Sequence, residues 1–173
     1  MTIEIVAWDP QWPRRFELER ESIAQALRPW IVAGIEHVGS TAVPGLAAKP
    51  VIDIMAPVAS LEASRDAVAG AAAIGYLHYP YQPDVMHWLC KPSPQYRTHH
   101  LHVVPYRSRL WFERLAFRDA LRSDSRLLRE YAALKRRMAA ESGSDREAYT
   151  DGKTGFIQRV LAATSNEDTD HGP

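Results

Sequence analysis

The stretch that decides the fold runs from Ile35 to Met55 and reads IEHVGSTAVPGLAAKPVIDIM. A β-strand ending at Val38 would deliver Gly39 and Ser40 into a tight turn. There, glycine lets the backbone come close to a ligand and serine offers a hydroxyl group. The free backbone N–H groups of such a turn favour an anion. The pattern therefore predicts a phosphate site at this turn.

Asp53 lies inside the apolar run from Val51 to Met55. An unpaired carboxylate in such surroundings is costly, so we expect a partner for it, and a metal ion is one candidate. Because side chains alternate along a strand, Asp53 and Met55 should share one face. A two-metal phosphoryl-transfer site needs clustered carboxylates to hold its ions. Met55 therefore occupies the position at which a second acidic ligand is expected.

A second unusual cluster lies in residues 97–104, which read RTHHLHVV. Alternation along a strand places His100 and His102 together on one face, and His99 on the opposite, core-facing side. With Asp53 the two imidazoles would form a two-histidine, one-carboxylate set that can ligate a divalent metal. A role without metal remains equally open, with histidine as the ion-pair partner of Asp53 or as a general acid or base.

Two lysines are candidates for phosphate binding. Lys49 precedes a proline at the mouth of the Asp53 strand, and Lys153 lies between two glycines near the start of the last predicted helix. Either ammonium group would neutralise phosphate charge, whereas a solvated loop lysine is the alternative for Lys49. Thr41, beside Ser40 in the turn, completes the predicted binding residues.

Other side chains allow both a functional and a structural interpretation. Candidates for phosphate contacts across a cleft, which helix-to-helix salt bridges would explain equally well, are Arg118, Asp119 and Arg122. Candidates for stacking on a base, for which core packing is the stronger expectation, are Trp88, Trp111 and Tyr149. The default interpretation of His37, just before the turn, is a hydrogen-bonded, half-buried residue.

Length and composition limit the class of protein. A chain of 173 residues, 46% hydrophobic and 24% charged, suits one globular domain. The net charge is zero, although residues 105–160 carry 13 basic against 8 acidic side chains, so nucleic-acid binding is not expected. The single Cys90 excludes an intrachain disulfide framework, and no apolar run of membrane-spanning length occurs. These features predict a cytoplasmic protein without membrane association.

The hydrophobic pattern predicts an α+β protein, with a mixed sheet and flanking helices in residues 1–104 and a helical part in 105–162. One domain should span 1–162, followed by a disordered tail over 163–173. The expected strands cover about 31–38, 50–57, 76–79, 86–91 and 97–104. The expected helices begin near Pro13, Ser60 and Leu110, with two more around 127–138 and 146–162.

The central stretch resembles the signature of the GrpB family. Further matching segments extend the resemblance over roughly residues 4–162, and they read WDPQWPRRFE from Trp8, HLHV from His100, FRDALR from Phe117, YAALK from Tyr131 and YTDGKTGFI from Tyr149. The resemblance implies a fold similar to polymerase-β-type nucleotidyltransferases. In that superfamily a Gly-Ser turn holds a nucleotide triphosphate, and two carboxylates one residue apart bind metal ions. Gly39, Ser40 and Asp53 match this pattern, and Met55 departs from it.

The expected function is that of a nucleotidyltransferase-like protein. It would bind a nucleotide or another phosphate-bearing small molecule at the Gly-Ser, Asp and His site, with a divalent metal such as Mg²⁺, Mn²⁺ or Zn²⁺ as a candidate cofactor. One alternative is a non-catalytic module that binds a nucleotide or a coenzyme A-like ligand for regulation. A second alternative is a metal-dependent phosphoester hydrolase. The acceptor, the base and the oligomeric state stay open.

Overall fold

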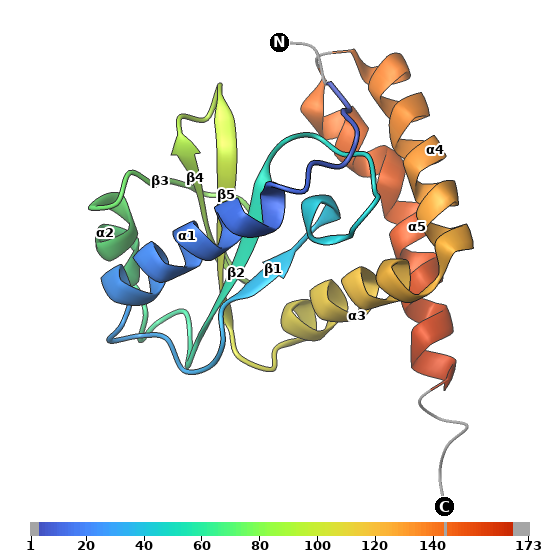
Figure 1. Cartoon of the computed structure of the whole chain (residues 1–173). Coiled ribbons are helices and arrows are strands. Elements are labelled where there is room, and N and C mark those ends of the chain that lie inside the picture. The colour runs from blue at the N-terminus through green and yellow to red at the C-terminus, as the bar shows by residue number, and fades with distance from the viewer. Residues whose placement is uncertain (1–3, 144, 168–173) are drawn as a thin grey trace, which may run out of the picture.

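The computed structural model describes residues 4–143 and 145–167 of the chain (Figure 1). In chain order its elements are α1 (Trp12–Ala26), β1 (Glu36–Val38), the short 3₁₀ helix η1 (Ser40–Ala42), β2 (Ile52–Val58), α2 (Ala67–Ala72), β3 (Leu77–Tyr79), β4 (His87–Pro92), β5 (Arg97–Pro105), α3 (Arg109–Ser123), α4 (Ser125–Ser142) and α5 (Arg146–Glu167). Strands occupy the first part and long helices the second, which confirms the predicted α+β class.

The strands form one mixed sheet in the order β1-β2-β5-β4-β3. The central pair, β2 and β5, is parallel, and the other neighbouring pairs are antiparallel. The parallel pair is made of the two strands that carry Asp53 and the histidines. Because segments far apart in the chain meet at the middle of the sheet, the site rests on the most extensively paired strands.

Helices α1 and α2 cover one face of the sheet. The buried positions of α1 are Trp12, Phe16, Glu19 and Ile23, at spacings of four, three and four, so one stripe of the helix faces the sheet. The sheet contributes alternate residues such as Ile52, Ile54, Leu101 and Val103 to this core. Burying each such aliphatic side chain stabilises the fold by about 1.5–3 kcal/mol relative to leaving it exposed.

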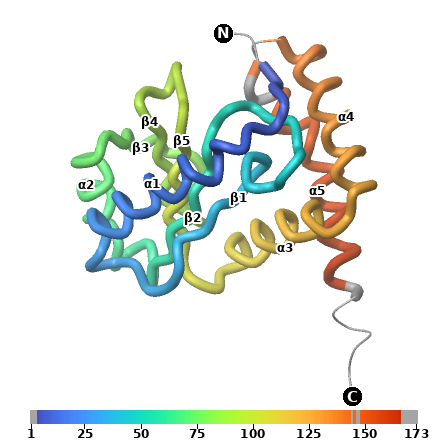
Figure 2. Tube along the Cα trace, in the orientation of Figure 1, coloured from blue at the N-terminus to red at the C-terminus, as the bar shows by residue number. Residues whose placement is uncertain are grey.

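The opposite face of the sheet packs against α3 through a second hydrophobic cluster that includes Met55, Trp88 and Trp111. A third cluster joins the loop after η1 to α4, with Val43 and Leu46 packed against Tyr131 and its neighbours. Figure 2 shows this loop reaching from the sheet towards the pair formed by α4 and α5, which lie side by side. The C-terminal helices are thereby held next to the Gly-Ser turn.

Local signals fix the borders of the long helices. The hydroxyl oxygen of Ser108 accepts a hydrogen bond from the backbone of Trp111 at 3.3 Å and caps α3. The carboxylate of Asp124 accepts hydrogen bonds from Arg126 and Leu127 at 2.7 and 3.2 Å and caps α4. Such caps satisfy N–H groups that have no partner within the helix and contribute about 1 kcal/mol each.

Strand β1 is shorter than the predicted strand over 31–38. Its ladder pairs Glu36 with Met55 and Val38 with Asp53, so the next positions towards the N-terminus approach Pro57. Proline has no N–H group to continue the ladder. Only an isolated bridge between Ile31 and Val58 remains from the expected earlier part.

Two predicted helical boundaries were wrong. The helix expected from Ser60 to about residue 73 is reduced to α2, because the Ser64 hydroxyl donates to the Ser60 carbonyl at 2.7 Å and residues 61–66 form turns. In the predicted disordered tail, residues 163–167 belong to α5, since no proline or glycine interrupts the helix there. Residues 168–173 of that prediction lie outside the described part.

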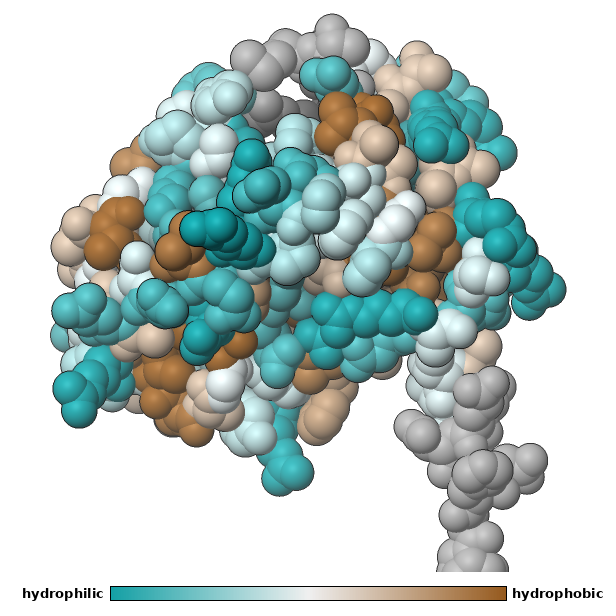
Figure 3. Space-filling model, viewed as in Figure 1, coloured by the Kyte–Doolittle hydropathy of each residue, from teal (hydrophilic) through white to brown (hydrophobic). Residues whose placement is uncertain are grey.

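The molecular surface carries mixed side chains. On the face seen in Figure 3, hydrophilic residues cover most of the surface, and the hydrophobic ones are scattered among them. Among the described residues, no helix combines the length and the apolar character that crossing a membrane requires.

Candidate functional site

The Gly-Ser turn lies directly beside Asp53. Val38, the last residue of β1, pairs with Asp53 across the antiparallel ladder, and Gly39 follows at once. Gly39 has φ 72° and ψ −173°, a backbone region almost restricted to glycine. A Cβ atom at this position would stand 2.6 Å from Oδ2 of Asp53. The turn thus requires glycine both for its backbone conformation and for the room that the carboxylate takes.

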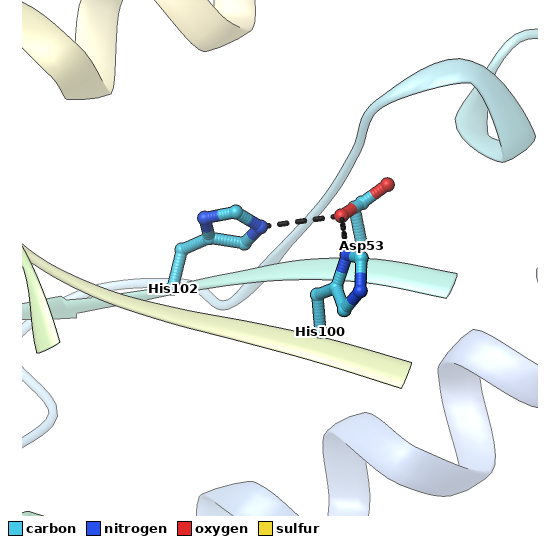
Figure 4. Close-up of side chains that lie close together, drawn as sticks. All are labelled: Asp53, His100 and His102. Carbon is cyan, nitrogen blue, oxygen red and sulfur yellow. Dashed lines mark hydrogen bonds and ion pairs between the residues drawn. The ribbon is translucent and has the colours of Figure 1, made fainter. Parts of the chain in front are cut away.

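His100 and His102 project onto the same carboxylate (Figure 4). Parallel pairing aligns Asp53 of β2 with His100 and Met55 with His102. His100 Nδ1 lies 2.9 Å, and His102 Nε2 3.2 Å, from the same Asp53 oxygen, Oδ1. His99 faces the other side of the sheet, 4.0 Å from a Glu19 carboxylate oxygen of α1. The structure therefore brings together the three residues that the sequence predicted as one set.

Electrostatics keep this carboxylate ionised. Burial would raise the pKa of Asp53, but the interactions with His100 and His102, led by their hydrogen bonds to the carboxylate, outweigh burial and hold the pKa far below its ordinary value. Burial lowers the pKa of His102 to about 4, although Asp53 opposes the decrease. At neutral pH the cluster therefore pairs a charged Asp53 with an uncharged His102. The side chains of Asp53 and His100 are 27% and 20% exposed, so one side of the cluster is open.

No second carboxylate joins Asp53 on its strand. Met55 has 0% of its surface exposed and packs in the cluster with Trp88 and Trp111. Glu36, opposite Met55 on β1, is held by Arg118 through an ion pair of 2.7 Å. Neither residue is placed to bind an ion beside Asp53.

Lysines from three segments gather beside the turn. The ammonium groups of Lys49 and Lys153 each lie 4.0 Å from the ring centre of Tyr149. Lys135 of α4 has only 1% of its surface exposed, and its ammonium group donates to the carbonyl oxygen of Ala47. Residues more than 80 positions apart in the chain thus supply positive charge to one region.

These positive charges disfavour one another. Burial, reinforced by the charges of Lys153 and Arg136, lowers the pKa of Lys135 to about 7. Burial, reinforced by the charge of Lys49 and opposed by that of Asp53, lowers the pKa of Lys153 to about 8. An anion placed among these ammonium groups would favour the charged forms of both lysines and raise their pKa values. The region therefore favours negatively charged ligands.

Three residues near the site escaped the sequence prediction: Lys135, Tyr131 and Arg114. Burial raises the pKa of Tyr131 to about 12, and a hydrogen bond with Ser40 opposes the rise, so α4 contacts the turn itself. Arg114 of α3 adds a positive charge that lowers the pKa values of His102 and Lys153. The spacing of four between Tyr131 and Lys135 was a usable signal, because it places the lysine on the buried stripe of α4.

Arg118 and Arg122 of α3 hold the segment around the turn by hydrogen bonds. Arg118 donates to Glu36 at 2.7 Å and to the His37 carbonyl at 3.1 Å. Arg122 donates twice to the Ala42 carbonyl, at 3.0 and 2.8 Å. Asp119 pairs with Arg118 at 2.8 Å. Of the two interpretations open for these residues, the structure supports the salt-bridging one.

Thr41 and His37 form a buried pair under the turn. The Thr41 hydroxyl donates to the Val51 carbonyl at 3.3 Å, so the His37 Nε2–H group, 3.0 Å away, donates to the hydroxyl. The imidazole stacks on Phe16 with ring centres 4.7 Å apart. Burial lowers the pKa of His37 to about 4 and leaves it uncharged. Thr41, with 2% exposure, thus supports the turn from below.

Among the aromatic candidates for base stacking, two are core residues. Trp88 and Trp111 are each only 5% exposed and belong to the cluster around Met55, as core packing predicts. Tyr149 of α5 is 3% exposed and has two ammonium groups near its ring. Its ring contacts are therefore with Lys49 and Lys153.

The mixed sheet, the Gly-Ser turn beside a strand carboxylate and the covering helices define a nucleotidyltransferase-like fold. The solved structure of the GLD-2/RNP-8 complex shares this fold with a TM-score of 0.57, over 84% of this chain and 57% of that chain. The sequence identity is 12%, so this likeness concerns the fold alone.

Within that class, the chain belongs to the GrpB family, whose model, described as GrpB protein, matches residues 2–163. A UPF0157 protein of Pseudomonas aeruginosa is 41% identical over 164 residues, covering 92% of this chain and 66% of its own length. The chain therefore spans slightly less than two thirds of that relative. The crystal structure of conserved protein GrpB from Enterococcus faecalis, 29% identical, has a TM-score of 0.84 over 95% of this chain and 98% of that chain.

Proposed function

We propose that the protein binds a phosphate-bearing small molecule, and specifically a nucleotide, between the Gly39-Ser40 turn and the C-terminal helices. One observation carries the proposal: the ammonium groups of Lys49 and Lys153 share the ring of Tyr149, and the charge of Lys153 acts on both Lys135 and Asp53, the carboxylate directly beside the turn. Backbone N–H groups of the turn and lysine charges are the elements with which proteins hold phosphates.

The shared fold supports nucleotidyl transfer to a small acceptor as the reaction class. An acceptor oxygen would form a bond to the α-phosphorus while the bond to the pyrophosphate leaving group breaks. The fold family runs this reaction with two Mg²⁺ ions, which prefer oxygen ligands. Here one carboxylate, Asp53, faces two imidazoles, so the residues present do not fit a pair of Mg²⁺ ions.

A non-catalytic binding module is the second candidate, and the buried Met55 favours it. Incubating the protein with ATP and Mg²⁺ or Zn²⁺ separates the possibilities, with released pyrophosphate and phosphate measured. Pyrophosphate release that is lost in Asp53→Ala supports transfer. Phosphate release without pyrophosphate supports a phosphoester hydrolase. Binding without either product supports the module.

We expect nucleotide binding to depend on Lys153. ATP or inorganic triphosphate at about 100 times its dissociation constant should stabilise the wild-type protein by about 2.7 kcal/mol. Lys153→Gln removes one charged donor, worth about 1.5–3 kcal/mol, so the dissociation constant should rise about tenfold or more. Thermal-shift titrations with ATP, triphosphate and coenzyme A measure both effects.

The matched control is Arg126→Gln, because the Arg126 side chain is 74% exposed and its ion-pair partner is Glu130 of the same helix. Its affinity should equal that of the wild type, which separates local phosphate contacts from the general basic charge of the helices. Equal stabilisation of wild type and Lys153→Gln by every ligand would contradict the proposed site. The proposed site would also be contradicted if none of the three ligands, ATP, triphosphate and coenzyme A, stabilised the wild-type protein.

A further inference from the structure

The donor atoms at the centre of the sheet differ from those that the fold family uses for Mg²⁺. Strand β2 offers one carboxylate, since the next residue on that face, Met55, lies in the hydrophobic core. Strand β5 offers the imidazoles of His100 and His102. Magnesium takes oxygen ligands in near-octahedral geometry and usually keeps several waters. Imidazole nitrogen suits zinc, iron, nickel and copper instead.

The geometry matches one small ion. Asp53 Oδ1, His100 Nδ1 and His102 Nε2 are separated by 2.9 and 3.2 Å along the two nitrogen–oxygen pairs, and a set of ligand atoms from the three residues lies within 4.8 Å. In a tetrahedral zinc site, with ligands about 2.0–2.1 Å from the ion, neighbouring ligand atoms lie about 3.3 Å apart. The two nitrogen–oxygen distances are therefore close to the spacing that a shared ion imposes.

The scaffold holds these side chains without relying on loops. Asp53 and His100 are register partners in the parallel pair, and His102 follows two residues along β5. A site on paired central strands is more rigid than one built on loops. Beyond the ring atoms that face Asp53, His100 Nε2 and His102 Nδ1 are buried and find no hydrogen-bond partner in the described part of the chain. No neighbouring group fixes the tautomers that would aim two N–H donors at Asp53, whereas coordination of a metal would fix both rings.

We infer that Asp53, His100 and His102 bind one divalent transition-metal ion of the zinc class, leaving the exposed side of the cluster for an oxygen ligand. The inference does not depend on nucleotide binding. It goes beyond the proposed function because it assigns a different metal chemistry to a fold that otherwise uses Mg²⁺.

The test measures metal binding without nucleotide. Chelator-treated protein is titrated with Zn²⁺ by calorimetry and with Co²⁺ by visible absorption, whose intensity separates four-coordinate from six-coordinate ions. We expect one ion per chain and no displacement by excess Mg²⁺. His100→Ala, His102→Ala and Asp53→Asn should each weaken Zn²⁺ binding about 100-fold or more, since removal of a ligand exceeds the 10–100-fold cost of losing an outer-shell partner.

His99→Ala is the matched control, because His99 is the sequence neighbour that faces α1 on the other side of the sheet. It should bind Zn²⁺ as the wild type does, and circular dichroism of all variants shows whether each is folded. Absence of Zn²⁺ and Co²⁺ binding, equal binding by folded His100→Ala or His102→Ala, or displacement by Mg²⁺ at similar concentration would overturn the inference. A failure here would leave the lysine-dependent phosphate site untouched.

Discussion

Gly39→Ala should destabilise the protein by about 2–6 kcal/mol. Two costs add at this position. The backbone, at φ 72° and ψ −173°, lies in a region that non-glycine residues occupy only with strain, at about 1–3 kcal/mol. The added methyl group would also meet the Asp53 carboxylate at 2.6 Å, where the strand leaves it little freedom to retreat. Urea unfolding monitored by fluorescence gives the free energy of unfolding.

Gly45→Ala supplies the comparison. Gly45 also has positive φ, at 81°, but a Cβ atom there would have no neighbour within 4 Å. The second variant therefore carries a conformational cost without a collision. The excess cost of Gly39→Ala reports the collision with Asp53 together with the difference in backbone strain between the two positions. Equal losses in the two variants would show that the close approach of turn and carboxylate is absent in solution.

The arrangement around Asp53 followed from the sequence because strand alternation has a strict period of two. Once 51–55 and 97–104 were interpreted as strands, their apolar residues fixed which face was buried, and His100 and His102 could only point together. The pairing register that puts Asp53 opposite His100 had no such signal. It depends on long-range packing of β2 and β5, and only the structure supplied it.

The clustering of Lys49, Lys135 and Lys153 could not be predicted from the sequence. Lys135 meets Ala47 across 88 positions of the chain, a contact that exists only because α4 folds back onto the loop after η1. Strand and helix limits were wrong for a different reason. Strand β1 is shorter than predicted because a proline on the neighbouring strand cannot continue the ladder. Helix α2 begins later than predicted because a serine hydroxyl hydrogen-bonds to the main chain. In both cases specific hydrogen bonding overrides the local hydrophobic pattern.

Lys135→Met should stabilise the protein at pH 6 and lose this advantage as the pH rises. The lysine pKa falls from 10.5 in the unfolded chain to about 7 in the folded one. Since each pKa unit corresponds to about 1.4 kcal/mol, a charged Lys135 costs the fold a few kcal/mol below pH 7. Between pH 7 and 10.5 the unfolded state binds more protons, so wild-type stability rises with pH. Methionine has a similar length and carries no charge, so its variant lacks this dependence.

The substitution also removes the hydrogen bond to the Ala47 carbonyl, worth about 1 kcal/mol. The net gain should therefore be about 2–4 kcal/mol at pH 6, and it should vanish or reverse near pH 10. Urea unfolding of both proteins from pH 6 to 10 measures the difference, to which Lys153, present in both proteins, contributes only through its coupling to Lys135. Arg126→Met, on the exposed side of α4, should show a pH-independent difference. A constant difference for Lys135→Met would mean that this lysine is not buried and charged as the structure has it.

The same cost bears on the proposed ligand. A buried ammonium group destabilises the free protein, but an anion beside it stabilises the charged form. Ligand binding therefore offsets the free-energy cost of burying the charge. Inorganic triphosphate should accordingly stabilise the wild type more than Lys135→Met at pH 6, and the two proteins should respond more alike as the pH rises above 8. If triphosphate stabilised the wild type and Lys135→Met equally at pH 6, Lys135 would destabilise the fold without taking part in phosphate binding. The site would then depend on Lys49 and Lys153 alone.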